Sequence, residues 1–395
     1  MLIHSLLFFG ALQGAQPPLQ AFASTSADSR LPQDTICQDD VLLRRSEADS
    51  WARVAVPQQT WMALLGDIDG DGLFDRPDGI DALAYLPDGM GNAPSVFDFV
   101  FSCDRDCFGF KDGDVLRLNR QGGLELVYAE DALEAILLPT GGSLDIDALT
   151  FPAPGQLYFS LKDSLSGTVL GDIQDGDVLC WDLAGQFVTV IADEAIIQGQ
   201  VSYATGSSSA FGDVKALSIH PVTQELLYTI QSPSGSDAAV FGEGQGGRIL
   251  PNWAEDDWQF QLSTEIDALA FVPAEVAQPI VLSTDVAYLS PNSVFQLRMR
   301  HAQAGERLSG AASPHKSIQS SLLGGVGYSV VDLGAQPLHR WPGRSQPALF
   351  ADNSGTADFQ TRTPFLPAGM LSAQIFYQVH GGISGWSSPL LIEVE

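Results

Sequence analysis

One six-residue motif recurs four times in this chain of 395 residues and limits what it can fold into more than any other feature. Each copy begins with a β-branched residue and a polar residue, continues with Ala-Leu, and soon ends in an aromatic residue or Ile. The copies are residues 80–85, 146–151, 214–219 and 266–271. Because side chains alternate across a strand, the motif predicts one repeated β-strand. Its leading residue and its small residues should share one face, with Leu and the closing residue on the other.

Further short strand-like runs follow the motif. Second strands are expected at residues 96–101, 157–161 and 226–230. Third strands are expected at residues 113–118, 176–181 and 247–250, and fourth strands at 124–128, 187–191 and 258–262. Units of four short strands within about 50 to 70 residues are typical of propeller blades.

The two ends of this array predict a closing blade. Residues 40–43 and 51–56 resemble a third and a fourth strand, while residues 266–271 supply a first strand and residues 280–282 a second. We therefore expect an all-β chain with a four-bladed β-propeller over residues 37–285. An open β-solenoid or stacked sandwiches could use the same repeats and remain the alternatives.

Charge marks a second boundary in the chain. Residues 1–289 hold 12 basic and 42 acidic side chains, a balance of −30, whereas residues 290–395 hold 7 and 6, a balance of +1. Short alternating runs between Gly, Pro and Asn turns predict a small C-terminal β-sandwich over residues 290–395. The strong negative charge would repel phosphate backbones, so nucleic acid is not an expected partner.

The N-terminal residues form a short apolar run that ends near Ala21-Phe22-Ala23, a small-x-small pattern. This predicts a signal peptide over residues 1–23 and a secreted or cell-surface protein. A buried N-terminal strand is the alternative. No later segment approaches the ~20 consecutive apolar residues of a membrane span, so none is expected.

Four cysteines in an oxidising compartment permit two disulfides. Cys103 and Cys107 bracket a tight acidic turn and form the best predicted pair. Nothing in the sequence decides how Cys37 and Cys180 pair.

An acidic loop immediately precedes the first copy of the motif. Counted from Asp67 as position 1, carboxylates stand at positions 1, 3, 5, 9 and 12, with Gly72 at position 6. This is EF-hand spacing, in which alternate side chains converge on a cation that prefers six to eight oxygens. The predicted calcium ligands are Asp67, Asp69, Asp71, the Leu73 carbonyl, Asp75 and Asp78. An unliganded acidic turn is the alternative.

The loop resembles the calcium loops of dockerins and related extracellular proteins, which also end in Asp rather than Glu. Dockerins carry two such loops with helices, whereas this chain contains one clear copy. The resemblance therefore implies calcium binding but not the cohesin-binding role. Because the segment after the loop belongs to a repeated strand, we expect calcium to hold the edge of a blade rigid.

The polar residue of the motif suggests a second site. Asp81, Asp147, Lys215 and Asp267 hold equivalent positions, so a closed ring would gather them near its axis. Such a cluster could hold a cation or a substrate. The alternative is structural, with repeated carboxylates bonded to the backbone of a neighbouring blade or paired with Lys215.

Signatures of common enzymes are absent from the sequence, including zinc-binding HExxH, nucleophile-elbow GxSxG and glycine-rich phosphate-loop motifs. Carboxylate-pair chemistry on extracellular polysaccharide needs none of them, so a calcium-dependent carbohydrate-active hydrolase or lyase is the alternative function. An exposed patch of Trp181, Trp253 or Trp258 would favour glycan or protein binding. These tryptophans would serve equally as blade core.

The IDAL strands, the DGDVL strands and the segment 352–357 that runs into 374–378 together resemble exported proteins of planctomycete-type bacteria. The resemblance implies export, an acidic propeller-like region and a small C-terminal β domain, but no particular activity. The function expected from the sequence is therefore a secreted or cell-surface, calcium-binding interaction or scaffold protein. Its partner would be an extracellular glycan or protein.

Overall fold

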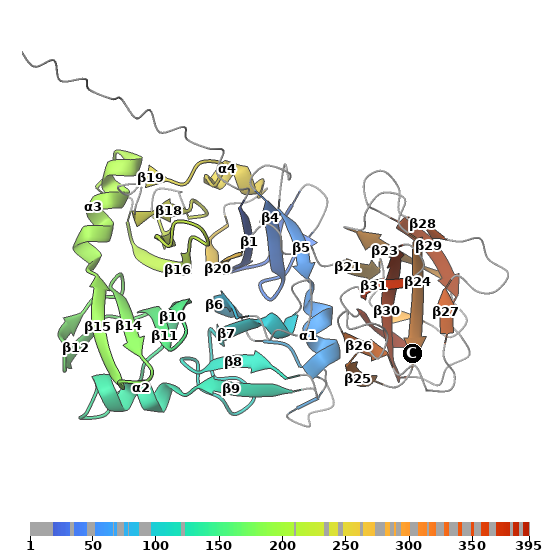
Figure 1. Cartoon of the computed structure of the whole chain (residues 1–395), viewed down its shortest axis with the longest axis horizontal. Helices are drawn as coiled ribbons and strands as arrows, with labels where there is room; N and C mark the ends of the chain where they lie inside the picture. Colours follow the sequence, from blue (N-terminus) through green and yellow to red (C-terminus); the bar gives the residue numbers. More distant parts are fainter. Residues whose placement is uncertain are drawn as a thin grey trace, which may run out of the picture.

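The computed structural model is mainly β and contains four blades in a propeller-like arrangement (Figure 1). The structure describes residues 19–31, 35–45, 52–65, 67–68, 75–77, 79–86, 96–119, 123–208, 211–232, 237–243, 248–260 and 264–272, and the strands between 281 and 394. The first strands of the blades are β6 (Ile80–Tyr85), β10 (Ile146–Ala153), β16 (Asp213–Ile219) and β20 (Ile266–Val272). Each contacts the first strands of both neighbouring blades, so the repeated motif lines the centre.

Each blade is an antiparallel sheet of four strands. Blade one adds β7 (Phe99–Cys103), β8 (Val115–Leu118) and β9 (Leu124–Tyr128); blade two adds β11 (Gln156–Leu161), β14 (Val178–Asp182) and β15 (Phe187–Ala192). Blade three adds β17 (Leu226–Gln231), β18 (Phe241–Gly242) and β19 (Arg248–Ile249); blade four adds β1 (Gln20–Thr25), β4 (Val41–Arg45) and β5 (Arg53–Val56). Two small hairpins, β2 (Ser29–Arg30) with β3 (Thr35–Ile36) and β12 (Leu165–Thr168) with β13 (Gly171–Ile173), lie between these strands in the chain.

Both ends of the array share blade four, as the sequence predicts, but its second strand is not the predicted one. Residues 280–282 were expected there, whereas β21 (Val281–Thr284) pairs with β23 (Val294–Arg300) in a different sheet. The second strand is β1, which lies between β20 and β4. The blade therefore takes three strands from the N-terminal side of the array and one from the C-terminal side.

Strand β1 overlaps the predicted signal peptide. Residues 1–18 lie outside the described residues, but the first four residues of the six-residue β1 are buried and pair with both neighbours. Cleavage after Ala23 would remove those four residues. The predicted cleavage position is therefore incompatible with the blade.

Blade three also departs from the predicted strand pattern. Residues 247–250 were expected as its third strand, but β19 within this range is the fourth, and β18 is the third. Residues 258–262 were expected as its fourth strand, yet Trp258 ends a short helix. Two-residue strands leave too little alternation for the period-2 pattern to identify them.

Four helices, which the all-β prediction missed, follow the fourth strands: α1 (Gln58–Leu65), α2 (Glu130–Leu137), α3 (Glu194–Thr205) and α4 (Glu255–Trp258). The first three helices share one hydrogen bond at their start. In each, the backbone N–H of the first helical residue donates to the side chain of the aspartate that immediately precedes the third strand of the same blade. These N–H to carboxylate distances are 2.6 Å for Asp40, 2.8 Å for Asp114 and 2.7 Å for Asp177. The DGDVL aspartates therefore hold helix starts.

Hydrophobic cores fill the four junctions between adjacent blades. In every copy of the motif, Leu packs against the preceding blade and Ala against the following one, as Leu83 and Ala82 do in blade one. The leading β-branched residue was expected on the Ala face, but Ile80 packs with Leu83. The reason is a β-bulge at Asp81, because one extra residue reverses the alternation of side chains.

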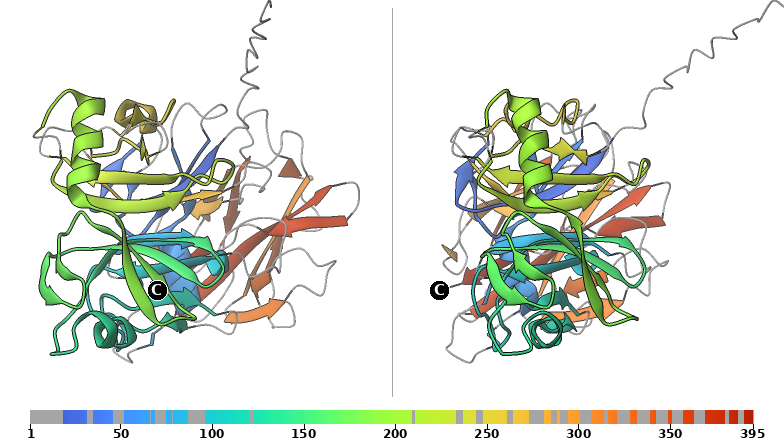
Figure 2. Two further views of the ribbon diagram at one scale, coloured as in Figure 1. Left: turned by 60° about the vertical axis from the view of Figure 1, so that its left-hand side comes forward. Right: turned by 90° about the vertical axis from the view of Figure 1, so that its left-hand side faces the viewer.

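All four first strands begin on one face, which we call the start face. Antiparallel order brings the loops between second and third strands to this face, together with the connections that contain α1 to α4. Figure 2 shows blade two and α3 from the side. The end of α1, the beginning of β6 and the turn after β7 therefore lie on the start face.

The chain beyond β20 forms further β-sheets. One contains β21, β23 and β29 (Ala357–Arg362). A larger one contains β22 (Tyr288–Leu289), β24 (Arg307–Ser313), β27 (His339–Trp341), β28 (Leu349–Phe350), β30 (Gly369–Val379), β31 (Gly382–Trp386) and β32 (Leu390–Val394), while β25 (Lys316–Ser320) pairs with β26 (Tyr328–Val331). Within the described part of the chain, no helix has the length and apolar character needed to cross a membrane.

Candidate functional site: a charged propeller axis

The polar residues of the motif belong to the four first strands, which contact one another at the centre of the blades. Each occupies the extra position of a β-bulge, since the pairing of every first strand skips it. The four bulged residues are Asp81, Asp147, Lys215 and Asp267. A bulge re-aims its side chain out of the regular ladder, and its repetition brings these four together at the axis.

Three more carboxylates join them from the residue two positions earlier in the chain. Asp145, Asp213 and Glu265 hold this position in blades two, three and four, and Gly79 holds it in blade one. We call these seven charged residues the axial cluster. These three acids were not among the predicted site residues. Their signal in the sequence is an acid two residues before the motif's polar residue in three of the four copies.

A ring of buried hydroxyls joins the blades beside the axial cluster. In each blade, a Ser or Thr of the second strand donates to the backbone carbonyl that precedes the bulged residue of the next blade. Ser24, Ser102, Ser160 and Thr229 donate to Ile80, Ile146, Val214 and Ile266 at 2.6, 3.1, 3.4 and 2.9 Å. One such bond at every junction closes the ring.

Lys215 is the centre of an ion triad within the cluster. Its Nζ lies 2.9 Å from Asp147 Oδ2 and 3.5 Å from Asp213 Oδ2. Burial lowers the pKa of Lys215, but the two carboxylates outweigh that effect and raise it. The structural alternative of pairing with Lys215 thus describes Asp147 but not Asp81.

The carboxylates of the cluster are electrostatically crowded. Burial raises the pKa of Asp81 and Asp267 well above their usual range, and nearby carboxylates raise it further. Burial and then Asp147 raise the pKa of Asp213 to about 8. Burial raises the pKa of Asp145 to about 6, although Lys162 lies 2.9 Å away. The cluster therefore holds protons near neutral pH.

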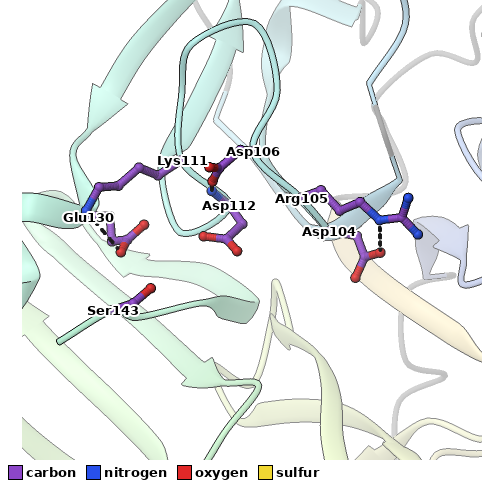
Figure 3. A pocket seen from close by; sticks show the side chains of 7 residues that line it. All are labelled: Asp104, Arg105, Asp106, Lys111, Asp112, Glu130 and Ser143. Atoms are coloured by element: carbon purple, nitrogen blue, oxygen red, sulfur yellow. Dashed lines mark hydrogen bonds and ion pairs between the residues drawn. The ribbon is translucent and has the colours of Figure 1, made fainter.

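A pocket of about 440 Å³ opens on the start face between blades one and two (Figure 3). Its walls combine both signs of charge: Asp104, Arg105, Asp106, Lys111, Asp112, Glu130 and Ser143. Lys162 connects it to the axial cluster, because this ammonium lies 2.7 Å from Asp104 and 2.9 Å from Asp145. Lys162 thus joins the pocket wall to the buried axial cluster.

Glu130 has a structural task in the pocket wall. Its carboxylate accepts the backbone N–H of Leu144 at 3.1 Å and of Gly113 at 3.3 Å, and lies 3.3 Å from Lys111 Nζ. Burial, and then a hydrogen bond with Glu134, raise the pKa of Glu130 to about 7. The side chain fastens the start of α2 to two loops.

The acidic loop of the predicted calcium site is only partly described. Asp69, Asp71, Leu73 and Asp78 lie outside the described residues, while Asp67 and Asp75 lie within them. The Ile68 N–H donates to Asp75 Oδ2, which brings positions 2 and 9 of the loop together. The described residues contain no group of three His, Cys, Asp or Glu side chains arranged to hold a metal ion.

A buried aspartate fixes both flanks of this loop. Asp39 accepts from the Gln58 side chain at 2.8 Å and the Gly79 N–H at 3.1 Å, and lies 3.3 Å from Arg76. Its backbone carbonyl accepts from the Trp61 indole at 2.9 Å. Gln58 and Trp61 belong to the helix before the loop, and Gly79 immediately precedes the strand after it, so Asp39 sets the distance that the loop spans.

The predicted cysteine pair and the three tryptophans singled out from the sequence are buried. Cys103 and Cys107 are buried thiols whose Sγ atoms lie 3.0 Å apart, so their disulfide remains a prediction. Trp181, Trp253 and Trp258 are at most 3% exposed. They are core, which removes the proposed aromatic binding patch.

Comparison with known proteins adds no family. No protein-family model and no curated protein matches the chain. A solved structure of Spo0M, a sporulation control protein from Bacillus subtilis, matches at 11% identity and a TM-score of 0.19, covering 30% of this chain and 49% of that one. The soluble domain of PmoD from Methylocystis matches at 12% identity and a TM-score of 0.16, covering 29% and 89%.

The chain thus spans about half the length of the Spo0M structure. Fold and site together define a class: a propeller-like protein with four blades and a charged axis.

Proposed function

We propose that this chain is an exported, calcium-binding interaction protein that binds an extracellular glycan or protein on its start face. The observation that carries the proposal is the anchoring of the acidic loop by Asp39, which holds the helix before it and the residue before β6. A loop with fixed ends loses little further entropy when its oxygens converge on an ion. Calcium bound there would hold the loop rigid.

The strands beyond β20 extend this proposal. We assign them to a C-terminal β-sandwich that works as a second module. Its charge balance of +1 contrasts with −30 for the rest of the chain. Such a contrast suits a separate task, because the acidic part would repel anionic surfaces that the C-terminal part would not.

Calcium binding is tested by thermal unfolding with and without chelator at constant ionic strength. At a free calcium concentration ten times Kd, a site present only in the folded state adds about 1.4 kcal/mol, a rise in Tm of a few degrees. The Asp69→Asn/Asp71→Asn variant should lose this rise. Asp163→Asn, an exposed aspartate outside the loop, should keep it. Equal melting temperatures with calcium and with chelator would contradict the calcium site.

The interaction role is tested with a glycan array and a hydrolysis screen on marine and plant polysaccharides. We expect calcium-dependent retention on the array without product formation. Retention by no glycan would assign the surface to a protein partner. Release of sugar products, abolished by a substitution in the pocket, would replace the proposal with the carbohydrate-active enzyme.

We favour the interaction role over a carbohydrate-active enzyme because the carboxylates of the pocket have structural roles. The pocket does contain carboxylates, but Glu130 is committed to backbone N–H groups and to Lys111. Asp106 accepts the Asp112 N–H at 3.2 Å and closes its own loop. Carboxylates with such tasks are poorly placed to act as a catalytic pair.

A further inference from the structure

Three buried carboxylate oxygens of the axial cluster have no hydrogen-bond donor among the described residues. They are Asp81 Oδ2, Asp145 Oδ1 and Glu265 Oε1, which belong to blades one, two and four. Asp81 is 2% exposed, and its other oxygen lies 2.8 Å from the Ser102 hydroxyl. A buried acceptor without a donor costs about 1–3 kcal/mol, so three at one place call for an explanation.

These oxygens belong to three side chains that all interact electrostatically with Asp147. Asp81 is close enough to Asp145, Asp147 and Asp267 for each carboxylate to raise its pKa. Glu265 likewise interacts with Asp147 and Lys215. The repeated bulge explains the convergence, since it turns one residue of every first strand toward the axis.

Charge within the cluster is unbalanced. Six carboxyl groups face two ammonium groups, Lys215 inside the cluster and Lys162 at its edge. Lys215 is used by Asp147 and Asp213, and Lys162 by Asp145 and Asp104. Neither lysine forms an ion pair with Asp81, although Asp81 is more deeply buried than either lysine. When its carboxyl groups are ionised, the site therefore lacks both positive charge and hydrogen-bond donors.

We propose that the propeller axis binds one hydrated divalent cation, whose water ligands donate to Asp81, Asp145 and Glu265. A hydrated cation supplies both missing quantities, because its charge offsets the excess of carboxylates and its waters are donors. The described residues hold no trio of carboxylates arranged for direct metal contact, which favours binding through the water shell. Mg²⁺ suits this mode, because it gives up its waters reluctantly.

The axial site is separate from the calcium loop. Asp81 stands within β6, whereas the predicted loop ligands end at Asp78, and the two sites use different carboxylates. The inference therefore does not rest on the proposed function, and each can fail alone.

The test uses the full chain with the Asp69→Asn/Asp71→Asn substitutions, so that the calcium loop cannot contribute. Calorimetric titration with MgCl₂ against metal-free protein should give one bound ion per chain. Thermal unfolding should show a Tm higher by a few degrees in MgCl₂ than in NaCl of equal ionic strength. Asp81→Asn added to this background should weaken Mg²⁺ binding at least tenfold, and Asp163→Asn should leave it unchanged.

Two outcomes would overturn the proposal. One is the absence of any Mg²⁺ binding to the loop variant, which would leave only ordinary water at the axis. The other is Mg²⁺ binding that survives Asp81→Asn. If Asp81→Asn does not fold, Glu265→Gln serves in its place, because Glu265 lies at the partly exposed edge and should show the same loss.

Discussion

At the scale of single residues, four hydroxyls determine how tightly the blades meet. Each hydroxyl donates a hydrogen bond to the backbone carbonyl beside a bulge, where the hydrogen-bond ladder between strands is interrupted. All four side chains are buried, so each hydroxyl stabilises a carbonyl inside the protein. The bond between Thr229 and Ile266 is the one that joins blade three to the blade shared by both ends of the array.

Thr229→Val should therefore destabilise the protein by about 1–3 kcal/mol, since it keeps the shape of the side chain but leaves the buried Ile266 carbonyl without its donor. Chemical denaturation monitored by fluorescence measures the change. Thr189→Val is the matched control, because Thr189 lies on the exposed part of β15, and its effect should stay within about 0.5 kcal/mol. Equal losses in the two variants would mean that the hydroxyl ring contributes nothing.

The sequence predicted the bulged residues but not the bulge. Four equivalent polar residues in a repeated strand indicated a shared position, and all four are the bulged residues of the first strands. The face of the sheet on which Ile80 lies was predicted wrongly. The prediction assumed that side chains alternate regularly, and the extra residue at the bulge moves Ile80 to the opposite face. The acids before the motif were overlooked for a related reason, since their partners lie in other blades.

At the scale of elements, blade four contains both strands that the repeat pattern predicts and one strand that it does not. Strands β4, β5 and β20 carry the repeat pattern and were predicted. Strand β1 has the sequence QAFAST, with small apolar residues that serve equally well in a leader or a buried strand. Composition could not separate the two interpretations, whereas pairing with β20 and β4 does.

Removal of residues 1–23 should therefore unfold the protein, while removal of residues 1–18 should not. Truncation after Ala23 deletes Phe22, which packs edge-on against Phe99 with centroids 4.9 Å apart. Loss of one buried Phe costs about 3–5 kcal/mol, a large share of the 5–15 kcal/mol that stabilises a typical domain. Circular dichroism melts of both chains give the answer. A cooperative melt from the chain that begins at Ser24 would show that β1 is dispensable.

At the scale of the whole molecule, the acidic residues include two groups with different roles. One group of carboxylates holds helix starts, as Asp40, Asp114 and Asp177 do. The DGDVL motif indicated only strands at these positions. A second group is buried at the axis and takes up protons, and the sequence could suggest its existence but not its burial. The calcium loop stays a prediction from spacing alone, because its expected ligands are local in the sequence, whereas the axial cluster becomes apparent only when the blades are arranged around a centre.

The buried axial carboxyls, together with Glu130 in the pocket wall, make stability depend on pH in a defined direction. Burial raises the pKa of Asp145 to about 6, of Glu130 to about 7 and of Asp213 to about 8, above the values of about 4 expected for an unfolded chain. Between those limits the folded state holds protons that the unfolded state has lost. The stability that these three groups contribute is therefore fully present below about pH 4. It is lost progressively as the pH rises to about 8.

In chelator, we thus expect the free energy of unfolding to decrease from pH 5 to pH 8. Each proton held only by the folded state contributes about 1.4 kcal/mol per pH unit to this slope. Asp145→Asn removes one such group and should flatten the slope most between pH 5 and 6, whatever it does to stability at a single pH. Asp163→Asn removes the same formal charge from an exposed position and should leave the slope as it was. Urea titrations at half-unit pH intervals measure all three proteins, and parallel slopes for both variants would assign the effect to general charge repulsion rather than to the axis.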